Sequence, residues 1–112
     1  MAGITPPVLG EFELLVVLAV LRLGDDAYPL AVASEIETTT GRKAARPSVF
    51  ITLNRLEDKG LLTSRYGDPS EARSGRPRRL FAPKPIAVRA VKAAMDRVEA
   101  LSRDLKHIFD TL

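Results

Sequence analysis

The chain has 112 residues and a formal net charge of +3, from 17 Lys and Arg against 14 Asp and Glu. This length predicts one domain, and 46% hydrophobic residues with charges of mixed sign exclude a disordered chain. The absence of cysteine excludes disulfides, and a single histidine without clustered carboxylates predicts neither a metal site nor a cofactor.

Two helices are predicted in the first 40 residues. The first covers residues 9–23, and because apolar side chains surround most of it, it should be central to the fold. Its apolar run at 14–21 is shorter than the roughly 18 residues of a membrane span. Since the N-terminus also lacks signal-peptide features, we expect a cytoplasmic protein without a membrane partner. The second helix covers 29–39, where Pro29 suits a first turn, and a very short strand is expected at 42–44.

A third helix is predicted over residues 47–59, ending at Gly60. At about 100° per residue, one side faces the core, flanked by Phe50 and Thr52. The core-facing side chains are Val49, Leu53 and Leu56. The opposite side carries Ser48, Ile51, Asn54, Arg55, Asp58 and Lys59.

A basic β-hairpin follows this helix. Residues 61–66 read as an apolar strand, 67–77 as a long tip rich in Gly, Pro and Ser, and 78–82 as the returning strand. A short amphipathic helix followed at once by such a hairpin is typical of winged-helix proteins. In these proteins the helix enters the major groove of duplex DNA and the hairpin, or wing, lies along the phosphates.

The last predicted helix runs from residue 85 to 109 and has a near-heptad apolar stripe. About 25 residues span roughly 37 Å, which is too long for the rest of the chain to cover. A second copy is therefore the expected partner, although packing of the whole stripe within the monomer is the alternative. The predicted dimerisation residues are Val91, Met95, Val98, Leu101, Leu105 and Ile108.

These elements predict a mainly α fold with a small β-hairpin. We expect a flexible N-terminus over residues 1–8, a winged helix-turn-helix domain over 9–83 and a C-terminal dimerisation helix over 84–112. The segment 42–79 holds ten Lys and Arg against four acids, a net charge of +6, and the remainder is −3. A charge this segregated indicates one surface for a polyanion, and the alternative is a solvated basic loop.

The order helix, helix, helix, hairpin and long helix, together with five stretches, resembles the PadR-like family of bacterial transcriptional regulators. The stretches are LGEFELLVVL at 9–18, GDDAY at 24–28, ASEI at 33–36, SVFITLNRLEDKGLL at 48–62 and GRPRRLF at 75–81. The resemblance covers residues 8–89.

The chain departs from the family pattern at four places. Phe50 stands where members usually carry Tyr, so a hydroxyl that could reach a phosphate is absent. Leu80 occupies the first aromatic position of the second wing strand. The sequence from Lys84 to Ala87 replaces a Thr-x-x-Gly helix start, and Tyr28-Pro29 replaces Tyr-Gly.

In such a regulator, the third helix would present Ser48, Ile51, Thr52 and Arg55 to the major groove. Arg55 suits bidentate contact with guanine, unless it pairs with Asp58 or Glu57 instead, and Ile51 suits a thymine methyl group. Ser48 lies at a helix N-terminus, which favours a phosphate, although it could also be an ordinary first-turn residue. The wing would contact phosphates or a minor groove through Arg76, Arg78 and Arg79, and with them Arg73.

We therefore expect a sequence-specific DNA-binding homodimer that acts as a repressor on a palindromic operator in double-stranded DNA. The resemblance implies that a planar aromatic or drug-like effector at the dimer interface releases the DNA. The alternatives are a winged-helix module that binds protein and an architectural DNA binder without sequence preference. No catalytic motif is present, so an enzyme is not expected.

Overall fold

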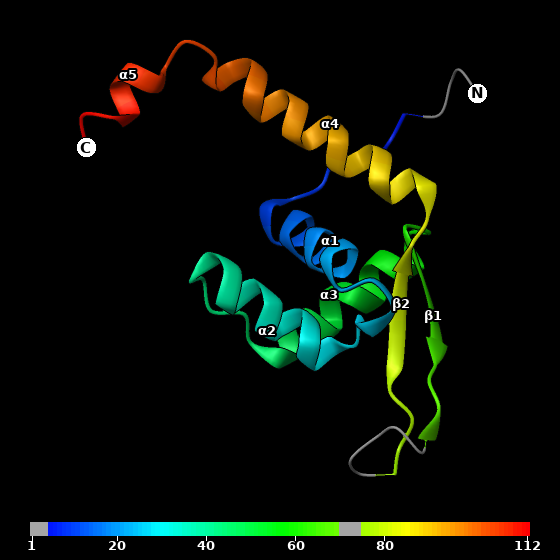
Figure 1. The fold of residues 1–112 in the computed structure, drawn as a ribbon. Helices are drawn as coiled ribbons and strands as arrows, with labels where there is room; N and C mark the ends of the chain where they lie inside the picture. The colour runs from blue at the N-terminus through cyan, green and yellow to red at the C-terminus, as the bar shows by residue number, and fades with distance from the viewer. Residues whose placement is uncertain (1–4, 70–74) are drawn as a thin grey trace.

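The computed structural model describes residues 5–69 and 75–112, and it confirms the predicted fold class (Figure 1). Three helices precede an antiparallel two-stranded hairpin, and a long helix and a short one follow it. The elements are α1 (Glu11–Leu23), the 3-10 turn η1 (Gly24–Asp26), α2 (Pro29–Thr40), α3 (Arg46–Asp58), β1 (Leu62–Tyr66), β2 (Arg79–Pro83), α4 (Pro85–Ser102) and α5 (Lys106–Phe109). Residues 42–44 form no strand, so that prediction is wrong.

The core lies where α1, α2 and α3 meet the hairpin. Helix α1 packs against α2, α3, α4 and β2, as expected from the apolar side chains around most of its surface. Phe81 of β2 is 2% exposed and closes the core from the hairpin side. Its backbone N–H also donates to the carbonyl of Ala27 at 2.8 Å. The hairpin is therefore fastened to the segment between η1 and α2 as well as to α3.

The junction between α3 and the hairpin is a Schellman motif. The N–H of Gly60 donates to the carbonyl of Glu57, and the N–H of Leu61 donates to the carbonyl of Leu56, both at 2.9 Å. Gly60 has a φ of 80°, which a side chain would disfavour. Leu56 and Leu61 are both buried, as this motif usually requires. The motif fixes the angle at which the chain leaves α3 for β1.

The C-terminal segment is two helices, so the predicted single helix over residues 85–109 is wrong. Helix α4 begins with Pro85 in its first turn and needs no side-chain cap. It ends at Ser102, because Arg103 is extended and Asp104 has a φ of 65°. Asp tolerates this left-handed conformation better than most residues, so the helix stops without Gly or Pro.

The molecule is more extended than a compact domain of the same number of residues. The radius of gyration is 16.0 Å, whereas a compact domain of this length has about 13 Å. Figure 1 shows the reason: α4 crosses over α1 and continues past it, so that α5 stands clear of the other helices. Within the described residues, no helix combines the length and apolar character needed to cross a bilayer.

Candidate nucleic-acid interface

The outward face of α3 carries three of the four side chains of this helix that were predicted to meet DNA. Ser48 and Arg55 are exposed, and Ile51 is 56% exposed. Thr52 is different: it is 5% exposed, so the prediction that it reaches the major groove is wrong. Phe50, which was expected to flank the core, is 46% exposed and adds a second apolar side chain to this face.

Helical phase explains both corrections. At about 100° per residue, Thr52 lies roughly 65° from the centre of the core-facing side, whereas Phe50 lies roughly 95° from it and on the other flank. The sequence already contained this signal, because Val49, Leu53 and Leu56 define the direction of the core. The exposed face of α3 therefore combines two apolar side chains with basic and small polar ones.

Arg55 makes no ion pair within the described residues, so the expected alternative of pairing with Asp58 or Glu57 is not observed. Its positive charge still acts at a distance, because it helps to lower the pKa of the Glu13 carboxyl. Arg46, in the first turn of α3, is likewise exposed and without an ion pair in the described part of the chain. Sequence reasoning had left Arg46 out of the site.

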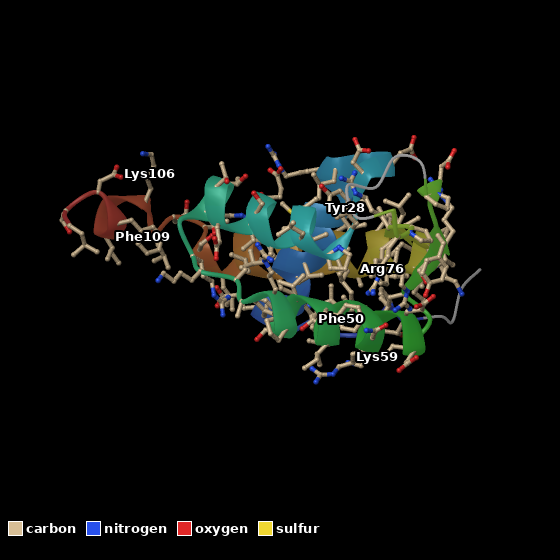
Figure 2. All side chains as sticks on the ribbon, turned by 90° about the horizontal axis from the view of Figure 1, so that it is seen from below. Tyr28, Phe50, Lys59, Arg76, Lys106 and Phe109 are labelled. Carbon is tan, nitrogen blue, oxygen red and sulfur yellow. The ribbon has the colours of Figure 1, made fainter. Side chains whose placement is uncertain are left out.

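The wing arginines point in different directions because side chains alternate along a strand. Arg78 stacks over the ring of Tyr28, with 4.3 Å between the guanidinium carbon and the ring centroid. It also lines a hollow with the acidic side chains Asp25, Asp26 and Asp68. Arg76 is exposed, and in the view of Figure 2 it lies between α3 and Tyr28. Arg73 lies outside the described residues.

Arg79 turns toward α3 and enters a polar cluster, here named the wing brace, formed by Asn54, Glu57, Ser64 and Arg79. Nε of Arg79 donates to Oγ of Ser64 at 3.1 Å, Nη1 donates to Oδ1 of Asn54 at 2.5 Å, and Nη2 pairs with the Glu57 carboxylate. Oγ of Ser64 donates to Oε2 of Glu57 at 2.7 Å. The prediction that Arg79 points to a phosphate is therefore corrected: its guanidinium is occupied within the chain.

The electrostatics of the brace favour an ionised Glu57. The hydrogen bond from Ser64 is the largest cause that lowers the pKa of the Glu57 carboxyl, and the charge and hydrogen bond of Arg79 add to it against a partial burial effect. The pKa of Glu13 is lowered first by the hydrogen bond from the Gly10 backbone and then by Lys59. Both carboxylates are therefore negative at neutral pH.

Acidic residues of α1 neutralise part of the basic segment, which the charge count along the sequence did not reveal. Glu13 pairs with Lys59 at 3.0 Å and Glu11 pairs with Arg42 at 3.6 Å. Arg42 also lies over the ring of Phe12 at 5.1 Å. Within the described part of the basic segment 42–79, the exposed cations without an ion pair include four side chains: Lys43, Arg46, Arg55 and Arg65.

A second exposed surface lies on α4 and α5 and is apolar. Val91 is 5% exposed and packs within the chain, so its predicted role in dimerisation is wrong. Leu105 is half-buried. Exposed apolar side chains continue along both helices, and Figure 2 shows Phe109 of α5 away from the body. They are Val88, Met95, Val98, Leu101, Ile108, Phe109 and Leu112.

Solved structures of transcriptional regulators share this fold. A PadR family regulator from Clostridium difficile is similar over 91% of this chain and 97% of its own, with a TM-score of 0.67 and 18% identity. A PadR family regulator from Eggerthella lenta is similar over 88% of this chain and 83% of its own, with a TM-score of 0.64 and 20% identity.

A transcriptional regulator from Clostridium thermocellum is similar over 85% of this chain and 89% of its own, with a TM-score of 0.66 and 16% identity. No protein-family model and no curated protein matches the sequence. The likeness to the PadR family therefore concerns the fold, and it extends over 85–91% of the chain.

Proposed function

We propose that this chain is a sequence-specific DNA-binding transcriptional regulator that binds a palindromic operator as a homodimer and acts as a repressor. The observation that carries the proposal is the exposed face of α3, where Arg46 and Arg55 have no ion pair in the described residues. Beside them lie the small and apolar side chains that read base edges, Ser48 and Ile51. The wing adds Arg65 and Arg76 on an adjoining element.

Dimerisation is supported by the apolar surface of α4 and α5. Met95, Val98 and Leu101 are 53%, 64% and 84% exposed on successive turns of one helix. A second copy placed on this stripe would bury it and hold two α3 helices on one face of the DNA. Their spacing would then be about 34 Å, one turn of the duplex, or a multiple of it.

The proposal also includes release of the DNA by a small aromatic effector. An apolar hollow of about 260 Å³ lies between α1 and α2, not on the α4 and α5 surface where the family resemblance implies an effector. Its lining includes Leu15, Leu18, Ala19 and Ile36, with the paired side chains of Arg22 and Glu35. A cavity of about 150 Å³ is enough for benzene. The volume and the apolar lining of this hollow support binding of a small aromatic molecule. A concentration-dependent rise of the melting temperature with a planar aromatic acid would test that binding.

Fluorescence anisotropy with two duplexes tests the DNA-binding function. One duplex carries the promoter region upstream of the gene that encodes this chain, and the other is a random sequence of equal length. We expect tight binding to the promoter duplex, weaker binding to the random one, and a loss of affinity between about 50 and 200 mM salt. Equal affinity for both would favour an architectural DNA binder, and no binding to either would favour a protein-binding module.

A further inference from the structure

Buried apolar side chains anchor the hairpin from its base to the middle of its strands. Leu62 of β1 lies at the end nearer α4 and is 1% exposed, and Phe81 lies in the middle of β2, opposite Ser64, and is 2% exposed. Toward the tip, Tyr66 is 70% exposed and pairs with Arg79 across the sheet. Without another attachment, the outer half of the wing could tilt about the packed end.

The wing brace supplies one such attachment, and the stack of Arg78 on the ring of Tyr28 is another. Arg79 lies two residues nearer the tip than Phe81, and its three guanidinium nitrogens reach acceptors on both α3 and β1. Asn54 is itself fixed, because its Nδ2 donates to the carbonyl of Phe50 at 3.0 Å. The brace therefore joins the outer half of the wing to the residues of α3 that stand next to its exposed face.

Charge also argues against a phosphate contact at Arg79. Its positive charge is balanced by Glu57 in direct contact, and the two side chains are 24% and 29% exposed. A phosphate that approached Arg79 would also approach the Glu57 carboxylate. Removing Arg79 should therefore leave unchanged the number of counterions released when the protein binds DNA. Removing a cation that contacts a phosphate should lower that number.

We propose that Arg79 and Glu57 are positioning residues that set the angle between the wing and α3 and so allow both to engage one DNA duplex at once. This inference rests on the proposed DNA-binding function. It assigns to Glu57, an acidic residue within a DNA-binding surface, a role that increases affinity. A simple charge argument predicts the opposite, because a carboxylate near DNA should repel it.

The test compares Arg79→Lys, Arg79→Gln and Glu57→Gln with the wild-type chain on the promoter duplex over a range of salt. Lys keeps the charge but cannot reach three acceptors, so we expect Arg79→Lys and Glu57→Gln each to weaken binding about tenfold. The slope of log affinity against log salt should stay unchanged. Arg65→Gln is the matched control for lost charge: it removes a cation that the proposed function places on the DNA, so it should lower the salt slope, and it leaves the brace untouched.

Hydrogen exchange of the backbone amides in β1 and β2 gives a readout that does not need DNA. Exchange should become faster in all three brace variants and stay unchanged in Arg65→Gln. Circular dichroism checks that each variant is folded, and Ser64→Ala provides a milder break of the brace if Arg79→Gln unfolds.

Three results would overturn the inference: Arg79→Lys binds like the wild type, Glu57→Gln binds more tightly, or Arg79→Gln lowers the salt slope by about 0.9. If the wild-type chain binds no duplex, the proposed DNA-binding function fails by itself. The exchange rates then decide alone, because unchanged rates in the variants would show that the brace does not hold the wing.

Discussion

The surface of α3 and the wing differs from the surface of α4 and α5 in how well water solvates it. Arginine heads such as Arg55 are well hydrated, so the first surface is stable in water until a polyanion displaces its counterions. The second surface exposes Val98 and Leu101, whose burial would be favourable by about 25 cal/mol per Å². The charged surface is therefore stable in water without a ligand, whereas covering the apolar surface with a partner would be favourable.

The largest expected effect comes from putting charge on the apolar surface. Val98→Glu together with Leu101→Glu should convert a dimer into a monomer, because carboxylates would be buried at the contact. Loss of the second DNA-binding half should weaken operator binding by about 100-fold or more. Light scattering and anisotropy measure the two effects. Arg89→Glu, on the opposite side of α4, is the control that should remain dimeric, and a dimeric double variant would contradict the dimer model.

Truncating one buried and one exposed leucine compares the two kinds of apolar residue. Leu53→Ala should lower the free energy of unfolding by about 2–5 kcal/mol at any protein concentration, because it leaves a cavity within the chain. Leu101→Ala should cost less, and its cost should depend on protein concentration, since only a partner buries that side chain. Denaturation at two protein concentrations measures this. A cost at Leu101 that does not vary with concentration would indicate packing within the monomer.

Substitutions on α3 test which of its faces reads DNA. Arg55→Ala should lower affinity for the promoter duplex by about 1–3 kcal/mol and change binding to random duplex much less. Thr52→Ser, which keeps the hydroxyl at a buried position, should leave affinity unchanged. Anisotropy with both duplexes distinguishes the cases. An equal loss on the two duplexes would make Arg55 a phosphate contact.

The smallest expected effect is the response to acid. The folded-state pKa values of Glu57 and Glu13 are lowered, so their stabilisation is fully present above the unfolded value of about 4.3 and is lost as pH falls through the folded values. We expect the Glu57 contribution to be below about 1 kcal/mol, since the pair is partly exposed. Thermal unfolding of wild type and Glu57→Gln between about pH 6 and 3 measures it. A difference in melting temperature that does not shrink toward low pH would contradict this assignment.

Local chemistry in the sequence was enough to predict the winged helix. The apolar side chains around residues 9–23, Gly60 after α3 and the Gly- and Pro-rich tip are signals that act within a few residues. The structure agrees with the first two, and with the tip in its described residues 67–69 and 75–77. The C-terminal break was missed because Asp104 is a weaker stop signal than Gly or Pro. The spacing of apolar residues is not interrupted at Asp104, so periodicity did not predict the break.

The sequence by itself determined the order of the elements as far as the start of α4, and the outward face of α3, because both depend on helical and strand periodicity. Only the tertiary structure decided how each charge is used. Glu13 meets Lys59 across 46 positions of sequence, and Arg79 meets Glu57 across 22. Ion pairs of this separation form when folded elements come together, so Arg55 keeps an unpaired charge within the described residues while Arg79, in the same basic segment, becomes part of the frame that holds the wing.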